Sequence, residues 1–267
     1  MSTSLNKGTA LITGASTGIG SVYADRLAQR GYDLILVARD GQRLDALAKR
    51  IASGTGRKVE TLPADLTLKG DLARVEQRLR SDAGITALVN NAGFGATAKL
   101  IDSNIDEMEN MIQLNVTALT RLTAAVLPGL LEKKTGVIIN ISSIAALSPE
   151  VLNGVYSGTK AFVVNLTQSL HNEVKGKGIQ VQAVLPGATS TAFWDRASLP
   201  IANLPEQIVM TAEEMVDASL AGLDRDELIT VPSLPELGDW DKFEAARKAL
   251  GPNLSRKHAA PRYGVNA

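Results

Sequence analysis

The chain has 267 residues, and its 28 lysines and arginines balance its 28 aspartates and glutamates. A net charge of zero gives no sign of the excess positive charge that binds nucleic acid or an anionic membrane, so neither is expected as a partner. The absence of cysteine excludes disulfides and thiolate chemistry, and His171 and His258 are too far apart in the sequence to form a local metal site. The first residues fit neither a signal peptide nor a membrane span, which predicts a cytoplasmic protein.

Short apolar runs alternate with helical patterns through the first part of the chain. The runs at 9–13, 33–39 and 58–66 predict strands, and the periodic segments 19–31 and 40–53 predict the helices between them. Because the runs are apolar at consecutive positions, the strands are expected to be buried on both faces, as in a parallel sheet covered by helices. This order predicts a doubly wound α/β fold.

The same alternation continues up to residue 187. Further strands are predicted at 85–93, 136–143 and 179–187, and long helices at about 104–132 and 154–175. We therefore expect six strands in this part of the chain. The length is consistent with a single domain over residues 1–267.

Beyond residue 187 the pattern is looser. Residues 188–210 mix small, aromatic and proline residues, which predicts a loop with short helical pieces, a candidate substrate lid. Thr211 and Glu214 form a capping-box pattern that predicts a helix over 211–224. A last strand fits residues 227–233, and residues 234–267 form a C-terminal tail.

A glycine-rich turn, TGASTGIG, separates the first predicted strand from the first helix. Gly14, Gly18 and Gly20 let the backbone approach a pyrophosphate, which the positive end of the following helix also attracts. A tight turn that binds nothing is the alternative, but the position between a strand and a helix favours a nucleotide site. The other candidate contacts in this turn are Ser16, Thr17 and Ile19.

The end of the second predicted strand should meet the ribose of an adenine dinucleotide. Proteins that bind NAD usually place a carboxylate there, whereas an arginine favours the 2′-phosphate of NADP. Ala38 and Arg39 occupy this position and Asp40 follows, so the sequence favours NADP(H) and leaves NAD(H) open. A solvated charge on Arg39 is the other interpretation.

Tyr156 and Lys160 stand one helical turn apart, so both can face one bound group. A free tyrosine ionises near pH ~10, and a neighbouring ammonium lowers the cost of forming the phenolate. Such a pair is suited to proton transfer. The same spacing also occurs by coincidence in many helices.

These motifs occur together with NNAG at 90–93, Asn115 in IQLNVTAL, NISS at 140–143 and LPGATST at 185–191. In order and spacing the set resembles the short-chain dehydrogenase/reductase family over residues 8 to about 191. The resemblance implies a single-domain Rossmann fold, with a doubly wound parallel sheet of about seven strands and helices on both faces.

The resemblance also implies a catalytic set. Tyr156 would be the general acid in ketone reduction and the general base in alcohol oxidation. Lys160 would bond the nicotinamide ribose and lower the pKa of the tyrosine, Ser143 would orient the substrate, and Asn115 would support a proton relay. Ser142 should face the other way on an extended strand. Taken singly, Asn115 could instead cap or kink its helix, and Ser143 could satisfy a backbone group at the strand end.

Cofactor contacts follow from the same resemblance. Asp65 would hydrogen-bond the adenine beside Leu66, and the NNAG segment would lie against the adenine ribose. The PGATST segment would lie near the nicotinamide, with Thr191 binding its carboxamide. The remaining contacts implied in these segments are Asn91, Ala92, Gly93, Pro186 and Gly187.

Apolar residues of the lid are candidate substrate contacts, and an apolar lid favours a ketone or aldehyde with an apolar flank. Core packing of this segment is the alternative. The candidates in the lid are Phe193, Trp194, Leu199, Ile201 and Leu204. Further candidates are Phe94 after NNAG, and Leu147 and Val151 between the predicted serine and tyrosine.

The sequence thus predicts an NADPH-dependent carbonyl reductase, reversible as an alcohol dehydrogenase, acting on a small molecule. The alternatives are a 3-oxoacyl carrier-protein reductase and a non-catalytic NADP(H)-sensing regulator, although regulators of that kind usually lack the tyrosine or the lysine. The resemblance implies a homodimer or homotetramer. Residues 223–255 replace the family's usual C-terminal strand and its aspartate-glycine-glycine turn, which affects the expected tetramer contacts.

Overall fold

The computed structural model describes residues 7–197 and 199–265. The chain divides into two compact units, Met1–Pro232 and Ser233–Ala267. All described strands belong to the first unit, whereas the second holds α9 (Leu237–Ala249) and short 3₁₀ turns. The predicted tail therefore lies outside the unit that contains the sheet. The prediction of one domain over the whole chain stays a prediction.

Seven parallel strands form one sheet in the order β3-β2-β1-β4-β5-β6-β7, which confirms the predicted Rossmann fold. The strands are β1 (Thr9–Thr13), β2 (Asp33–Ala38), β3 (Val59–Pro63), β4 (Ile85–Asn90), β5 (Gly136–Ile141), β6 (Ile179–Val184) and β7 (Ile229–Thr230). The last strand is shorter than the predicted 227–233. Pro232 lies two residues beyond it and has no N–H to continue the ladder.

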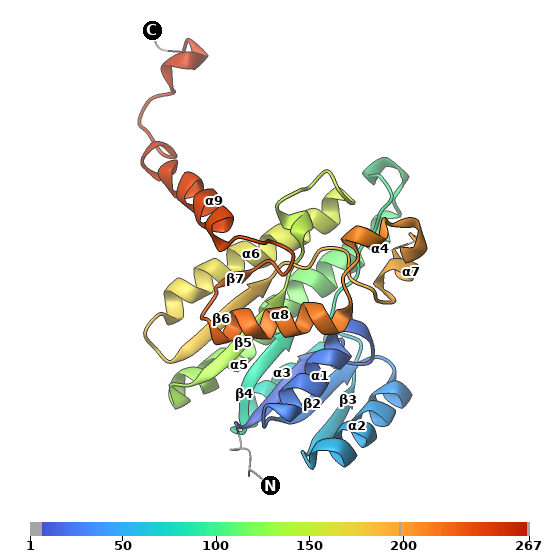
Figure 1. Ribbon diagram of the computed structural model, residues 1–267. Helices are drawn as coiled ribbons and strands as arrows, with labels where there is room; N and C mark the ends of the chain where they lie inside the picture. Colours follow the sequence, from blue (N-terminus) through green and yellow to red (C-terminus); the bar gives the residue numbers. More distant parts are fainter. Residues whose placement is uncertain (1–6, 198, 266–267) are drawn as a thin grey trace. The chain divides into compact units, whose positions relative to one another are not determined.

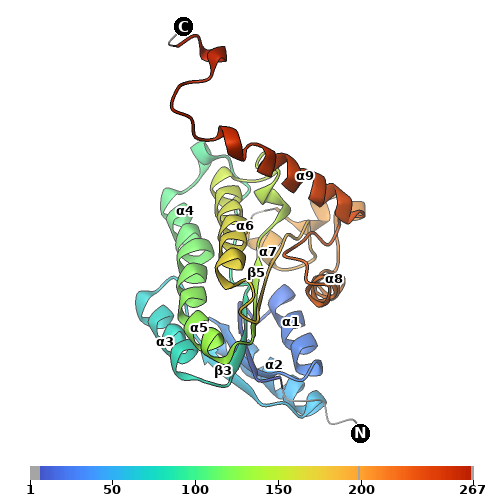
Figure 2. The same cartoon turned by 90° about the vertical axis from the view of Figure 1, so that its left-hand side faces the viewer.

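Helices cover both faces of the sheet, as Figures 1 and 2 show. One face carries α1 (Gly18–Gln29), α2 (Gly41–Thr55) and α8 (Ala212–Asp224), and the other carries α3 (Lys69–Ser81), α5 (Leu119–Lys133) and α6 (Gly154–Val174). Alternate residues of the central strands enter the two apolar clusters, Ile12 on the first face and Leu11 on the second. Both faces are therefore buried, which is why these strands are apolar at consecutive positions.

The predicted helix at 104–132 is continuous but not uniform. It consists of α4 (Ile105–Ile112), a π-helical turn (Gln113–Ala118) and α5. By length and composition alone, Ile105–Lys133 could cross a membrane. Here α5 packs against α3 and β4, which accounts for its apolar face.

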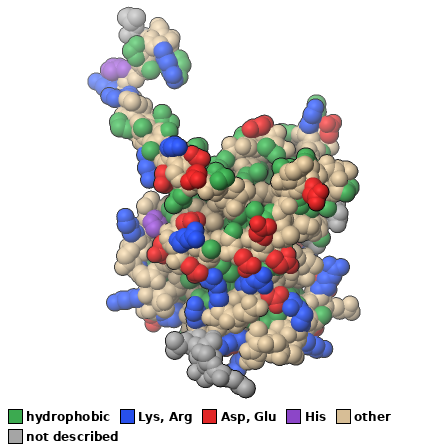
Figure 3. Space-filling view, in the orientation of Figure 1, with side chains coloured by type: hydrophobic (Ala, Val, Ile, Leu, Met, Phe, Trp, Pro, Cys, Tyr) green, Lys and Arg blue, Asp and Glu red, His purple; other side chains and the backbone are tan. Residues whose placement is uncertain are grey.

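Helices α1 and α8 lie side by side and are joined by ion pairs. Arg26 pairs with Asp217 at 2.6 Å and Arg30 with Asp224 at 2.8 Å. Over these helices, Figure 3 shows acidic and basic side chains interspersed. The pairs are partly solvated, so each is expected to contribute less than about 1 kcal/mol, and the buried apolar contacts beneath them dominate this packing.

A buried polar ladder crosses the middle of the sheet. Asn90 on β4 donates to the Oδ1 of Asn140 on β5 at 2.9 Å and to the hydroxyl of Thr123 on α5 at 3.0 Å. Asn140 in turn donates to the hydroxyl of Thr167 on α6 at 3.0 Å. The ladder fixes α5 and α6 to the strands whose ends carry the candidate site.

We expect Asn140→Leu to lower the free energy of unfolding by about 1–3 kcal/mol, because it leaves the buried Asn90 amide and Thr167 hydroxyl each one partner short. Urea unfolding would measure the loss. Asn172→Leu on the exposed side of α6 is the matched control and should change stability by less than about 0.5 kcal/mol. Equal stability of the two variants would contradict this role of the ladder.

Candidate active site

The glycine-rich turn between β1 and α1 is tightly folded. Gly14 and Gly18 have φ values of +65° and +56°, which residues with side chains rarely adopt. A Cβ on Gly14 would lie 2.7 Å from Nδ2 of Asn91, and one on Gly20 would collide with the Gly14 carbonyl oxygen. Thr17 makes no side-chain cap bond, and the first turn of α1 has no acidic residue. The N–H groups of that turn lack intrahelical partners and suit a pyrophosphate.

Thr13 joins this turn to the end of β4. Its hydroxyl donates to the Val89 carbonyl at 3.3 Å and accepts from the backbone N–H groups of Asn91 and Ala92, both at 3.0 Å. The Asn91 amide donates to the carbonyls of Thr13 and Gly14 at 2.9 and 3.1 Å. These bonds join the carboxyl ends of β1 and β4, where the strand order reverses. Doubly wound sheets bind their ligands at this position.

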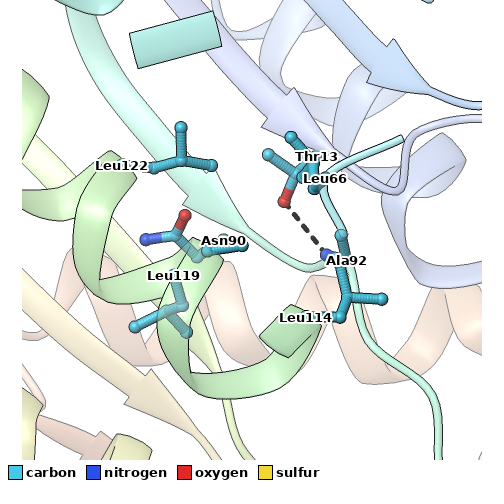
Figure 4. Close-up of a pocket in the computed structure, with 8 residues that line it drawn as sticks. Thr13, Leu66, Asn90, Ala92, Leu114, Leu119 and Leu122 are labelled. Carbon is cyan, nitrogen blue, oxygen red and sulfur yellow. Dashed lines mark hydrogen bonds between the residues drawn. The ribbon is translucent and has the colours of Figure 1, made fainter. Parts of the chain in front are cut away.

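A small crevice opens beside this junction (Figure 4). Its walls are mostly apolar and include two of the predicted cofactor residues, Leu66 and Ala92. The lining residues are Thr13, Leu66, Asn90, Ala92, Leu114, Ala118, Leu119 and Leu122.

The end of β2 presents a cation and not a carboxylate. The strand ends at Ala38, and the following Arg39 side chain is 67% exposed. Asp40 instead caps α2, accepting from the backbone N–H of Arg43 at 3.0 Å and pairing with its guanidinium at 3.2 Å. The Arg39 guanidinium lies 4.0 Å from Asp65. The Asp40 carboxylate, a candidate partner for a ribose hydroxyl, is thus engaged in capping α2.

Asp65 is held by its own loop. Its Oδ1 accepts from the backbone N–H and the hydroxyl of Thr67 at 3.0 and 2.7 Å, and its backbone N–H donates to Asp71 at 2.7 Å. The side chain is still 29% exposed. Its carboxylate is therefore fixed in place while one edge remains open to a ligand.

Asn115 lies in the π-helical turn between α4 and α5. Its amide accepts from the backbone N–H of Phe94 at 3.2 Å, and donates to the Phe94 carbonyl at 2.9 Å and to the Thr159 hydroxyl at 3.1 Å. Thr159 donates to the Tyr156 carbonyl at 2.7 Å. Asn115 therefore ties the segment after β4 to α6 beside Tyr156, and the wide turn allows this inward reach.

Three of the predicted catalytic side chains come from the end of β5 and the start of α6. Tyr156 and Lys160 are buried, and the Lys160 Nζ lies 5.7 Å from the tyrosine ring centre and donates to the Ile141 carbonyl at 2.9 Å. Ser143 follows β5 in an extended conformation, and its hydroxyl accepts from the backbone N–H two residues later at 3.1 Å. Ser142 points elsewhere, as predicted, and its hydroxyl donates to the Lys160 carbonyl at 2.8 Å.

Burial controls the protonation of the pair. It raises the pKa of Tyr156 to about 12, although a hydrogen bond with the Ser143 side chain favours the phenolate. It lowers the pKa of Lys160 to about 8. Desolvation by burial is the largest cause of the tyrosine's shift. The expectation that Lys160 lowers the pKa of the tyrosine stays a prediction. The tyrosine keeps its proton at neutral pH.

The lid segment is anchored at several points. A β-bridge joins Thr189 to Met210, and the backbone N–H of Met210 donates to the Ala188 carbonyl at 2.9 Å. Within the segment, the buried Trp194 donates from its indole to the Thr189 carbonyl at 2.8 Å. The Thr97 hydroxyl donates to the carbonyl of residue 197 at 2.7 Å. Trp194 thus serves as an anchor of the segment.

The other candidate substrate residues differ in burial. Phe94 and Phe193 are partly buried and pack on the apolar cluster that contains Tyr156. Leu147 and Val151 are 40% and 56% exposed. Phe193 begins α7 (Phe193–Arg196), and its ring centre lies 5.8 Å from that of Tyr156.

The remaining predicted cofactor residues lie on the loops around this site. The Pro186 carbonyl accepts from the N–H of Ile144 at 3.0 Å, and the Gly187 carbonyl accepts from the Thr189 hydroxyl at 3.2 Å. A Cβ on Gly18 would lie 3.0 Å from the Thr191 methyl group, so this loop adjoins the glycine-rich turn. Ile19 packs on the core of the first face, and Ser16 lies within the turn itself. A Cβ on Gly93 would lie 3.0 Å from the Asn115 Oδ1.

Residues 8–200 match the family model described as short chain dehydrogenase. This match covers most of the chain and includes the glycine-rich turn, Ser143, Tyr156 and Lys160. The chain belongs to the short-chain dehydrogenase family. It is accordingly an oxidoreductase that acts on CH–OH or C=O groups with a nicotinamide cofactor.

Solved short-chain dehydrogenases resemble the chain over nearly its full length. One from Sphingobium yanoikuyae, in complex with NADPH, is 49% identical with a TM-score of 0.92, covering 95% of this chain and 98% of that one. A bulky-bulky ketone specific alcohol dehydrogenase from Comamonas testosteroni is 44% identical with a TM-score of 0.89, covering 97% and 99%. The very-long-chain 3-oxoacyl-CoA reductase of Bos taurus is 33% identical over 218 residues, 78% of this chain and 68% of that protein.

Three residues of this short-chain dehydrogenase site were not singled out from the sequence. Thr13 holds the NNAG segment, Thr159 links Asn115 to α6, and Gly95 adjoins the ring of Phe193. Thr13 could have been found, because it is the first residue of the TGASTGIG turn. Thr159 and Gly95 gave no signal, since their contacts are with residues 44 and 98 positions away, a separation that no local pattern reports.

Proposed function

We propose that this short-chain dehydrogenase uses NADPH to reduce ketones. One observation carries the proposal: the buried phenol of Tyr156, which keeps its proton at neutral pH, has the Ser143 side chain as a hydrogen-bond partner and the Lys160 ammonium close by. A phenol that retains its proton is a general acid for a carbonyl oxygen. The phenolate is the corresponding general base for the reverse oxidation.

The residues present fit NADPH. A turn that excludes side chains at Gly14 and Gly20 lies at the start of α1 and suits the pyrophosphate. Arg39, exposed at the end of β2, suits the 2′-phosphate, and Asp40 is engaged in capping α2. NADPH is also the cofactor bound in the Sphingobium relative. When bound, it supplies a hydride to the carbonyl carbon.

In the proposed mechanism, the hydroxyl groups of Ser143 and Tyr156 hold the carbonyl oxygen. Tyr156 gives its proton to that oxygen as negative charge develops there, which leaves a phenolate on the tyrosine. The Lys160 ammonium stabilises this phenolate. Asn115 fixes α6 through Thr159, so that Tyr156 and Lys160 keep their positions during the transfer.

Apolar surroundings support a ketone as the substrate. Tyr156 packs in a cluster with Met108 and Met111, and Phe94 and Phe193 pack against the same cluster. A polar substrate would lose its hydration there without compensation. The Comamonas relative is described as a bulky-bulky ketone specific alcohol dehydrogenase, which supports a ketone substrate for this chain.

The test is consumption of NADPH and of NADH with a panel of ketones, aldehydes and 3-oxoacyl thioesters. Reduction of ketones with NADPH supports the proposal. Turnover confined to 3-oxoacyl thioesters would favour the second candidate, which the similarity to a 3-oxoacyl-CoA reductase supports. Binding of NADPH without turnover of any substrate in the panel would instead favour the regulator.

We expect Arg39→Gln to raise the Kd for NADPH about tenfold or more while leaving that for NADH unchanged, because only NADPH carries the phosphate that a guanidinium binds. Titration calorimetry with both cofactors measures the change. Lys49→Gln, which removes an exposed cation from α2, is the matched control. A parallel loss for both cofactors would show that Arg39 does not read the phosphate.

A further inference from the structure

The ring of Phe193 rests on a glycine. A Cβ added to Gly95 would lie 2.5 Å from Cζ of Phe193 and 3.1 Å from Cδ2 of Tyr156. Gly95 is buried and has no positive φ, so its backbone would accept alanine and only the space forbids it. The absence of a side chain at Gly95 therefore leaves the space that the Phe193 ring occupies beside Tyr156, and we call this packing position the seat of Phe193. The planes of the two rings are tilted by 50°.

Phe193 packs on Gly95 from a segment whose next residues are anchored. The neighbouring Trp194 is held by its indole bond to the Thr189 carbonyl, and Thr97 holds the carbonyl of Ala197. Phe193 itself is only partly buried and makes no polar contact through its side chain. Neighbouring residues therefore hold the backbone of Phe193, and its ring contacts Tyr156.

The geometry points to Phe193, seated on Gly95, as the residue that limits the size of the ketone substituent lying beside Tyr156. The inference rests on the proposed ketone reduction and adds to it the residue pair that sets selectivity. The ring touches the tyrosine whose hydroxyl would hold the carbonyl oxygen. Any substituent on that side of the carbonyl must therefore pack against this ring or displace it.

The expected consequence is a change in selectivity rather than in chemistry. Removing the ring opens a space in an apolar site, and one added methylene in such a site changes selectivity about tenfold or more. Phe193→Ala should therefore raise the ratio of kcat/KM for large ketones to that for small ones about tenfold. Turnover of the smallest ketone should fall modestly through a higher KM, because it loses an apolar contact.

The experiment measures kcat and KM with NADPH for a series of alkyl phenyl ketones whose alkyl groups have one to five carbons. It uses the full chain, Phe193→Ala, and Phe162→Ala as the control for loss of a phenylalanine on the outer side of α6. Phe193→Leu keeps an apolar contact and serves if the alanine variant does not fold. Circular dichroism and the Kd for NADPH report on folding independently of turnover.

Gly95→Ala tests the seat itself. It should alter the size ratio about threefold or more when Phe193 is present, and much less in the Gly95→Ala/Phe193→Ala double variant, since contacting residues couple and the atom that clashes is then gone. Equal effects of Gly95→Ala in both backgrounds would overturn the pairing.

The outcomes for the two proposals are distinct. If Phe193→Ala changes kcat/KM by the same factor for all ketones, Phe193 only maintains the fold and the inference is overturned, while the proposed function stands. If the unaltered chain reduces no ketone of the series, the proposed function is overturned, and the size limit with it.

Discussion

Replacing Tyr156 by phenylalanine is expected to lower kcat for ketone reduction by about 10³-fold, within the range that general acid catalysis contributes. The substitution removes only the hydroxyl. The ring that packs with Met108, Met111 and Phe193 remains, so the fold and the Kd for NADPH should be kept. The measurement is single-turnover reduction together with NADPH titration of the same preparation.

Tyr32→Phe provides the control, because it removes the hydroxyl of another partly buried tyrosine, one next to β2. This variant should reduce ketones at nearly the rate of the unaltered chain. Residual activity above about a tenth of that rate in Tyr156→Phe would exclude the tyrosine as the proton donor. A loss of NADPH binding in step with activity would point to a damaged fold instead.

Lys160→Met is expected to lower kcat about 10²-fold or more and, at the same time, to leave the protein at least as stable at pH 7. The buried ammonium carries a desolvation cost, which is why its pKa falls to about 8. Methionine removes that cost, although it leaves the Ile141 carbonyl without its lysine partner. A variant that is stable but inactive would show that Lys160 serves activity and not stability.

The same substitution has a pH signature in stability. Because the pKa of Lys160 is about 8 in the folded chain and 10.5 normally, the unfolded state binds more protons between these values. The lysine's contribution to the free energy of unfolding therefore rises with pH, by about 3 kcal/mol across the window. Urea unfolding of both chains at pH 7, 8, 9 and 10 should show that the free energy of unfolding of the unaltered chain rises with pH relative to that of the variant. A constant difference would show that the lysine is not desolvated as described.

Much of the fold follows from local sequence patterns. Six strands and the helices between them could be predicted because each strand is buried on both faces and is therefore apolar throughout. The shortness of β7 was not predicted, although Pro232 inside the predicted strand 227–233 indicates it, because proline has no N–H for the ladder. The π-helical turn at Asn115 was also not predicted, because its cause is a set of hydrogen bonds to Phe94 and Thr159, far from it in sequence.

The site shows a similar division. The glycine-rich turn and the spacing of Tyr156 and Lys160 are local, so sequence alone identified them. The ionisation of the pair is not local: it depends on how deeply the strands and α6 bury both groups, and burial raises the pKa of the tyrosine. The use of Asp40 as the cap of α2, which leaves Arg39 to follow the strand, likewise became evident only from the position of α2.

The β-bridge between Thr189 and Met210 gives the lid segment closely spaced ends. A loop whose ends are already joined can change in length or composition at small cost to the rest of the domain, because loop closure depends only weakly on length. The sheet, the glycine-rich turn and α6 lie outside this closed loop. We therefore expect that exchange of residues 190–209 between relatives changes the substrate range and leaves the proposed proton-transfer residues in place.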